Sequence, residues 1–221
     1  TTSVDKTGSG VWMLSGANTF SGSTRVLDGT LVVGATVPST GASVLGPSLP
    51  LIGGTTTAGL SSTAAILLAD GVNMQRGITV ASGVGVSQAI VLGGYGSGTS
   101  SFAIGTSTPN IQLDANRAVT LQAGNGGQVT FDNTWKIPST PNLSQALSVT
   151  FGSAGNAGTV VINQQISSQA YTVSLGTAKL GLGSSDTFYN GATSPVTVGS
   201  FLGTAILNLN SGTQMLANLT F

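Results

Sequence analysis

The acidic side chains are the residues of this chain best suited to chemistry, and they are few. The 221 residues include six Lys or Arg and six Asp, with no Glu, His or Cys. A hydrolase or lyase would need two carboxylates, or a carboxylate and a cation, to converge on one site. The candidates are Asp5, Asp28, Asp70, Asp114, Asp132 and Asp186.

The spacing of the acids argues against such a site. Asp28, Asp70 and Asp114 are 42 and 44 residues apart. If two coils of a repeat use about that many residues, the three carboxylates line one edge at intervals of about 10 Å. That distance is too large for paired acid–base catalysis. We therefore expect no catalytic residues.

Three arginines accompany these aspartates. Arg25, Arg76 and Arg117 each lie three to six residues from one of them. This proximity predicts ion pairs at the corners of a repeat. Exposed pairs of this kind contribute little to stability, so they would mainly solvate an edge of the protein.

Metal and cofactor sites are not expected either. Ca²⁺ requires several oxygen ligands from a dense group of aspartates, and Gly93-Gly94-Tyr95-Gly96 lacks the repeated aspartate of calcium-binding β-rolls. A nucleophilic serine needs a base such as histidine, which the chain lacks. Asn142 and Asn218 begin matches to the N-glycosylation acceptor pattern, which we interpret as incidental.

Composition indicates an all-β protein. The chain has 33 Gly, 40% hydrophobic residues and 5% charged residues. It is too hydrophobic for disorder, and its apolar runs end well before the roughly 20 residues that a membrane helix needs. A chain rich in Thr, Ser, Gly and Val without Glu favours strands and turns over helices. Its zero net charge argues against nucleic acid as a partner, because phosphate binding needs clustered Lys and Arg.

Residues 8–34 indicate how the strands would be arranged. They contain three short runs of alternating apolar character, Val11–Leu14, Ser23–Leu27 and Thr30–Val33, separated by Gly-rich corners. Each run is too short for a helix or for a free-standing hairpin. Such strands become stable when each one stacks on the next copy of a repeat. The segment is therefore typical of about one coil of a parallel β-helix.

The motif residues of this segment resemble a known repeat. Lys6-x-Gly8-x-Gly10 is followed by a Leu-Ser-Gly-Ala-Asn-Thr-Phe-Ser-Gly run and then by Gly-Thr-Leu-Val-Val-Gly. Over residues 6–34 this pattern is similar to the autotransporter-associated β-strand repeat of bacterial passenger domains and surface proteins. The resemblance implies a right-handed parallel β-helix on the bacterial surface, and no catalytic residues. The residues that carry it are Leu14, Gly16, Asn18, Phe20, Gly22, Gly29, Leu31 and Val33.

Residues 35–59 interrupt the pattern, since they are rich in Thr, Ser, Pro and Gly and include Pro38, Pro47 and Pro50. Proline cannot donate to a strand ladder, so we expect an irregular excursion here. With the opening three, 16 strand candidates give about five or six coils of three strands. The others are Ala64–Leu68, Gly77–Ala81, Ala89–Leu92, Phe102–Ile104, Ile111–Leu113, Ala118–Gln122, Gln128–Asp132, Leu147–Phe151, Thr159–Asn163, Tyr171–Leu175, Val196–Val198, Ala205–Leu209 and Met215–Phe221, with loops at Pro138, Pro141 and Pro195.

The fold prediction is one β-solenoid domain over residues 1–221. A β-sandwich is the alternative, because short strands at regular spacing fit that fold too. In the solenoid, Leu14, Val26, Leu31 and Val33 point into one elongated core. Strands pair in parallel with neighbours about 20 residues away in the chain.

The corners of the opening coil are predicted from its small and polar residues. Gly16, Gly22 and Gly29 are expected there, since glycine accepts the backbone angles of tight turns. Asn18 is the best candidate for a ladder of amide side chains stacked from coil to coil. The other Asn residues near corners are expected to be ordinary turn residues.

The two ends of such a solenoid would expose unpaired strand edges. Natural solenoids cover their ends with a polar cap or a helix, and the sequence shows no segment of that kind. An uncapped solenoid with so little charge is expected to stack end to end or to exchange strands, and heterologous contacts that do not close make filaments. The residues expected at this contact are Val4, Met215, Leu216, Leu219 and Phe221.

We therefore predict a non-enzymatic, secreted bacterial protein that forms an extracellular fibre or sheath from head-to-tail copies. No cofactor, nucleic acid or membrane insertion is expected. The alternative is an adhesin or a fragment of an autotransporter passenger that binds surface glycans, which would show an exposed aromatic or polar patch. A polysaccharide-active enzyme is a third interpretation that rests on analogy with other β-helices alone.

Overall fold

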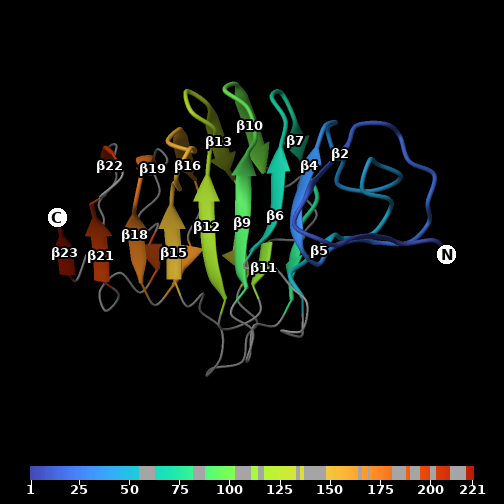
Figure 1. The fold of residues 1–221 in the computed structure, drawn as a ribbon, viewed down its shortest axis with the longest axis horizontal. Helices are drawn as coiled ribbons and strands as arrows, with labels where there is room; N and C mark the ends of the chain where they lie inside the picture. Colours follow the sequence, from blue (N-terminus) through green and yellow to red (C-terminus); the bar gives the residue numbers. More distant parts are fainter. Residues whose placement is uncertain are drawn as a thin grey trace.

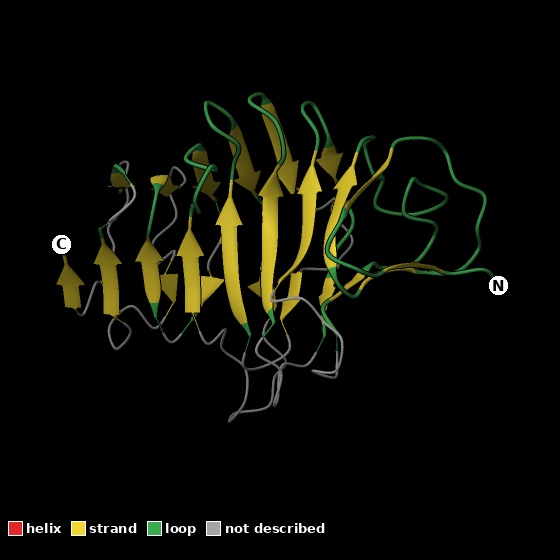
Figure 2. Ribbon diagram, in the orientation of Figure 1, coloured by secondary structure: helices red, strands yellow, loops and turns green. Residues whose placement is uncertain are grey.

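The computed structural model is a stack of short strands that runs from the N-terminus at one end to the C-terminus at the other (Figure 1). Its secondary structure is made of strands joined by turns and loops (Figure 2). In the part of the chain that is described, no helix has the length and apolar character to cross a membrane. The described residues are 1–54, 63–81, 88–102, 111–113, 117–132, 135–136, 148–163, 166–168, 170–180, 188–189, 195–199, 203–209 and 218–221.

The largest sheet has nine strands in sequence order, and every neighbouring pair is parallel. In Figure 1 most of its strands lie side by side in the front layer. Its strands are β2 (Val11–Leu14), β4 (Gly29–Val33), β6 (Thr63–Leu68), β9 (Ala89–Gly94), β12 (Ala118–Gln122), β15 (Ser148–Phe151), β18 (Tyr171–Val173), β21 (Pro195–Val198) and β23 (Asn218–Thr220).

Two six-stranded sheets, also parallel throughout, complete the coils. The first six-stranded sheet contains β1 (Val4–Lys6), β3 (Thr24–Val26), β5 (Leu51–Ile52), β8 (Thr79–Val80), β11 (Ile111–Leu113) and β14 (Trp135–Lys136). The second contains β7 (Asn73–Met74), β10 (Thr99–Phe102), β13 (Gln128–Phe131), β16 (Thr159–Ile162), β19 (Gly176–Leu180) and β22 (Ala205–Asn208). A further parallel pair joins β17 (Ile166–Ser167) to β20 (Phe188–Tyr189). These pairings confirm the predicted parallel β-solenoid and exclude the sandwich, whose strands would pair mainly in antiparallel.

The core is built from columns of apolar side chains in register from strand to strand. Alternate residues of a strand point to opposite faces, so every second side chain enters the space between the sheets. In the second six-stranded sheet, the rings of Phe102 and Phe131 stack with centroids 4.8 Å apart. The longest column in the nine-stranded sheet contains Leu31, Ile66, Leu92, Leu121, Phe151, Val173 and Val198, all buried.

The solenoid has more coils than the sequence predicted. Each strand of the largest sheet belongs to a different coil, so its nine strands correspond to nine coils, where five or six were expected. Eight steps of about 4.8 Å between them give a stack about 38 Å long. The count was too low because strands of two residues, such as β5, β7 and β14, are too short to show an alternating pattern. The spacing of about 20 residues holds for Val11 and its partner Thr30, whereas Gly29 and its partner Ala64 lie 35 residues apart.

Two further expectations, both based on prolines, were wrong. The sequence predicts a loop at Pro195, but this residue is the first of β21, a position where the missing N–H is tolerated. Likewise Pro50 directly precedes β5, so part of the predicted excursion over 35–59 belongs to the first six-stranded sheet. A boundary also differs at β10, which begins at Thr99 and ends at Phe102, the residue at which the sequence placed its start.

The rest of the 35–59 segment packs against the N-terminal coils. Val44 and Leu45 are buried and belong to the hydrophobic core. Asn18 Nδ2 donates to the Val44 carbonyl over 2.7 Å, and Thr24 Oγ1 donates to the Leu45 carbonyl over 2.9 Å. Figure 1 shows loops around this end of the stack, beyond β2 and β4. The sequence did not predict this packing, because Val44 and Leu45 are two apolar residues within a polar segment.

The residues of the sequence motif take the following places. Val26, Leu31 and Val33 are fully buried, whereas Leu14 is half-buried and packs against the core. Gly29 has φ +68° and lies so close to the carbonyls of the preceding coil that a side chain would collide with them. The motif thus positions one complete coil against the next.

Candidate functional site: corners and ends of the solenoid

The functional side chains lie mainly at two columns of corners. The upper corner, at the top of Figure 1, consists of the turns that lead from the nine-stranded sheet to the second six-stranded sheet. The lower corner leads from the first six-stranded sheet to the nine-stranded sheet. Because the coils stack in register, side chains far apart in sequence meet at these corners.

The aspartates do not line one edge as the spacing suggested. Asp28 precedes β4 and Asp70 follows β6, and because β4 and β6 are parallel neighbours, the two acids lie at opposite corners. Asp28 is buried, and its Oδ1 accepts from the Gly29 N–H over 2.9 Å. Asp70 Oδ1 accepts from the Gly98 N–H of the next coil, also over 2.9 Å. Asp132 is exposed, and Asp114 and Asp186 lie outside the described residues.

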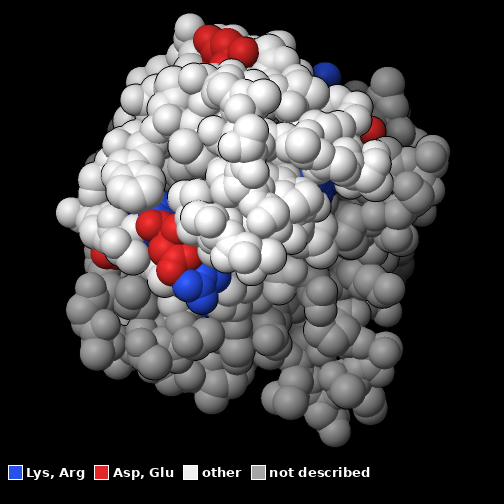
Figure 3. All heavy atoms as spheres, turned by 90° about the vertical axis from the view of Figure 1, so that its right-hand side faces the viewer, with Lys and Arg blue, Asp and Glu red and all other residues white. Residues whose placement is uncertain are grey.

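The predicted ion pair of Arg25 exists, but with a different acid. Arg25 Nε donates to Asp5 Oδ1 over 2.7 Å, and its second nitrogen donates to Oδ2. The two residues face each other because β1 and β3 pair in register. The Arg25 hydrogen bond lowers the pKa of Asp5 from its usual value, although burial acts in the opposite direction. Figure 3 shows this end of the molecule with few charged side chains on its surface.

Lys6 holds the first lower corner together. Its side chain is fully buried, and Nζ donates to the Asp28 carbonyl over 2.9 Å and to the carbonyls of Thr7 and Gly8. Nζ also lies 5.5 Å from the ring centre of Trp12, an attractive cation–π contact. The lysine of the repeat motif therefore ties the first coil to the second.

Gln88 and Arg117 continue this corner over the following coils. Gln88 Nε2 donates to the Leu27 carbonyl over 3.1 Å, and its Oε1 accepts from the Gly54 N–H over 2.9 Å. Arg117 donates from Nε to the Ala81 carbonyl and from Nη1 to the Gln88 carbonyl, each over 3.1 Å, and also to the Gly54 carbonyl. Both side chains are buried, and burial lowers the pKa of Arg117 from its usual value.

Arg76 likewise binds backbone carbonyls, here in the loop between β4 and β5 that packs against the N-terminal coils. It is buried and donates to the carbonyls of Gly41, over 2.7 Å, and Gly46, and to Ser43 Oγ over 3.2 Å. Burial lowers its pKa too. The sequence predicted an ion pair with Asp70, but Asp70 lies at the upper corner against Gly98. Distance in sequence suggested Asp70 as the partner, but the acceptors of Arg76 lie in a loop 30 to 35 residues earlier in the chain, which only the folded structure brings near.

These buried cations are hydrogen-bonded to backbone carbonyls. Buried carbonyls without a partner are costly, so each cation has a structural reason for its position. Among the described residues, no group of three or more acidic side chains is close enough to hold a metal ion. Gln88 was not singled out from the sequence, since its partners lie 34 and 61 residues away.

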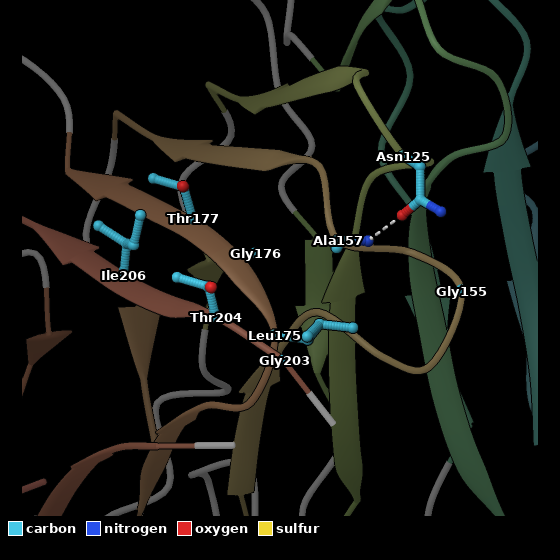
Figure 4. Close-up of a pocket in the computed structure, with 9 residues that line it drawn as sticks. All are labelled: Asn125, Gly155, Ala157, Leu175, Gly176, Thr177, Gly203, Thr204 and Ile206. Atoms are coloured by element: carbon cyan, nitrogen blue, oxygen red, sulfur yellow. Dashed lines mark hydrogen bonds between the residues drawn. The ribbon is translucent and has the colours of Figure 1, made fainter. Parts of the chain in front are cut away.

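A groove of about 500 Å³ lies at the upper corner near the C-terminal end. The turn after β15 spans residues 152–158, whereas the turn after β18 has only two residues, 174–175. This change in turn length leaves a step between neighbouring coils. Figure 4 shows the groove and the hydrogen bond in which Asn125 Oδ1 accepts from the Ala157 N–H over 2.8 Å. Its lining is uncharged: Asn125, Gly155, Ala157, Leu175, Gly176, Thr177, Gly203, Thr204 and Ile206.

The predicted amide ladder at Asn18 is replaced by a different contact. Asn18 Nδ2 donates to the Val44 carbonyl, 26 residues later in the chain. Rungs between coils are made instead by unlike partners, as where Ser101 Oγ donates to Asn73 Oδ1 over 3.1 Å. Of the two glycosylation patterns, Asn142 lies outside the described residues and Asn218 begins β23.

Of the residues expected at an assembly contact, the described ones lie at the two ends of the stack. Val4 is half-buried in β1, opposite Thr24. Leu219 is 43% exposed in β23, and Phe221 follows with 89% exposed. Met215 and Leu216 lie outside the described residues.

Comparison with known proteins matches one segment of the chain. The family described as passenger-associated transport repeat matches residues 4–33, which comprise β1 to β4 and the Lys6 corner. No curated protein and no solved structure matches the chain. Residues 4–33 are therefore similar to a passenger-associated transport repeat, a repeat of secreted and surface-exposed bacterial passenger proteins.

Proposed function

We propose that this protein is a structural, non-enzymatic β-solenoid of the bacterial surface whose copies join end to end into an extracellular fibre. The observation that supports this most is the exposure of inward-facing side chains at both ends of the nine-stranded sheet. Trp12 is in register with buried Leu31 but is 45% exposed, and Leu219 is in register with buried Val196 but is 43% exposed. Each would be covered by one further coil.

The two ends are complementary in direction and in register. All strands of the sheet are parallel, so β23 of one copy can pair with β2 of the next as β21 pairs with β23. Continuing the existing register places Thr220 beside Val11 and Phe221 over Trp12 of the next copy. Such a contact uses two different surfaces and does not close, and it therefore propagates as a filament.

The described charged groups support a role without catalysis. The buried cations bind carbonyls, and the paired acid Asp5 lies on the surface with Arg25. Replacing all six Asp by Asn should therefore remove no enzymatic turnover. Cleavage of a glycan that is lost with one of these replacements would contradict this part of the proposal.

Electron microscopy and cysteine cross-linking test the assembly. The chain has no Cys, so the double variant Val11→Cys with Thr220→Cys forms disulfides only through the introduced pair. Neighbouring positions on paired strands lie about 5 Å apart, within disulfide reach. We expect filaments and, after oxidation, a ladder of covalent multimers.

The matched control is Met13→Cys with Thr220→Cys, which shifts the pair by two residues, or about 7 Å along the strand. It should form filaments without the ladder. Filaments without a ladder in either variant would place the contact elsewhere. A chain that stays monomeric at high concentration would contradict the fibre itself.

The groove at the upper corner supports a second proposal, contact with an uncharged glycan. Thr177 and Thr204 place hydroxyl groups beside the apolar side chains of Leu175 and Ile206, and a sugar combines these two kinds of surface. Binding of neutral oligosaccharides, measured by calorimetry, should weaken with Thr204→Lys. The absence of binding to a panel of neutral glycans would rule it out.

A further inference from the structure

A column of threonines runs along the outer face of the nine-stranded sheet. Neighbouring strands bring these residues into direct register at the strand spacing of about 4.8 Å. They alternate along each strand with buried residues such as Val119 and Leu121, so they face outward. The Thr column consists of Thr120, Thr150, Thr172, Thr197 and Thr220.

Within the described strands, the face around the Thr column carries no charge. None of the nine strands of this sheet contains a charged residue. The charged residues in described strands, such as Asp5, Arg25 and Lys179, belong to the other two sheets. In the strands from β12 onward the aromatic residues Phe151 and Tyr171 are buried in the core, so the outer face is lined by small or polar uncharged side chains.

The chemistry of threonine makes this column a rigid periodic array. Each hydroxyl can donate one hydrogen bond and accept two, and the branched side chain is stiff at χ1. Threonine is common in strands, so one outward threonine needs no special explanation. Five successive coils with threonine at the same position give instead a regular row of hydroxyl and methyl groups on a flat, stiff support.

The lack of charged and aromatic side chains on the described part of this face excludes several classes of partner. Nucleic acid needs clustered cations, and a tight protein interface is enriched in aromatic residues, Met and Arg. A row of evenly spaced neutral hydroxyls suits a ligand whose hydrogen-bonding groups repeat at the same spacing. Ordered water is such a ligand, because its hydrogen bonds to a protein are nearly as favourable as direct protein–protein hydrogen bonds.

We propose that the Thr column binds the surface of ice crystals. The oxygen atoms of ice repeat at a distance close to the spacing between neighbouring strands, so the hydroxyls can join one row of the lattice while the methyl groups lie between its oxygens. The absence of strongly hydrated ions on this face favours that ordering. This inference is independent of the end-to-end assembly.

Freezing assays test the proposal. The purified chain should separate the freezing point from the melting point and slow the coarsening of ice grains. The double variant Thr150→Lys with Thr172→Lys places charges in the middle of the column and should lose most of both effects. Thr150→Val with Thr172→Val, which keeps the shape without the hydroxyls, should show a partial loss.

The matched control is Thr130→Lys with Val161→Lys, which changes a column of the second six-stranded sheet and should retain both effects. Circular dichroism and urea unfolding establish that each variant is folded. A parent chain without effect on freezing, or a control that loses as much as the Thr column variant, would overturn the proposal. Binding to an insoluble polysaccharide that depends on Thr150 and Thr172, without an effect on ice, would overturn it in favour of a glycan surface.

Discussion

The coils before and after Arg117 are stabilised in different ways. In the N-terminal coils, the buried side chains of Lys6, Arg76, Gln88 and Arg117 bind backbone carbonyls of other coils or loops. Columns of stacked aromatic and aliphatic side chains run through both regions, so in the described residues the buried cations are what distinguishes the N-terminal coils. The two charged side chains whose burial is described in the later coils, Asp132 and Lys179, are exposed and half-buried.

The buried donors serve loops whose lengths vary from coil to coil. Paired residues of neighbouring strands in the nine-stranded sheet lie 19 residues apart in sequence at Val11 and Thr30, but 35 apart at Gly29 and Ala64. A long excursion that packs against the core buries carbonyls that no ladder can satisfy. Side-chain donors are needed at those places, whereas a regular coil satisfies its backbone through its neighbours.

Removing a buried cation from the N-terminal coils should have the largest effect. Arg117→Met keeps much of the length of the side chain but leaves the carbonyls of Gly54, Ala81 and Gln88 without these donors. We expect a loss of about 3 kcal/mol or more in the free energy of unfolding, measured by urea denaturation. Arg25→Met, at an exposed arginine, is the control and should change little. Similar losses for both variants would mean that the buried carbonyls find other partners.

Gly29→Ala should have the second largest effect, because it combines strain with a collision. The residue has φ +68°, and an added Cβ would meet the carbonyls of Gly8 and Gly10. We expect a destabilisation larger than the roughly 1–2 kcal/mol of a left-handed backbone alone. Gly126→Ala, with φ +77° and open space, isolates the backbone contribution. Equal effects at the two positions would show that the close approach of the coils is not needed.

In the later coils, Phe131→Leu should cost about 1–2 kcal/mol, since the smaller side chain leaves part of the core unfilled and the ring stacking is lost. The stack with Phe102 predicts coupling, so Phe131→Leu combined with Phe102→Leu should destabilise less than the sum of the single variants. A double-mutant cycle in urea measures this. Strict additivity would contradict a specific contribution of the stacked rings.

Asp5→Asn should have the smallest effect at neutral pH, because the Asp5–Arg25 pair is on the surface. Since the folded state lowers the pKa of Asp5 below its usual value of 3.8, the contribution of the pair is present above that pH. It is lost as the pH falls through the lower, folded-state pKa. Stability curves of parent and variant should therefore converge in acid. A difference that grows as the pH falls would contradict the assignment.

The sequence alone was sufficient for the all-β class, the parallel stacking and the repeat at the N-terminus. Alternating residues of strands such as Ser148–Phe151 carry this information locally, and glycines mark where the chain must turn. Low charge and the absence of His and Cys likewise limit the chemistry that the chain can perform, because they remove most general bases and metal ligands.

Only the tertiary structure decided the partners of the charged side chains and the columns that the coils create. Arg25 pairs with Asp5, 20 residues away, and Arg117 reaches a carbonyl 63 residues away, since coil lengths vary and set which residues meet. The alignment of Thr120, Thr150 and Thr172 likewise depends on the lengths of the intervening loops. Local patterns determine whether a segment forms a strand, whereas register between coils is fixed by packing over the whole stack.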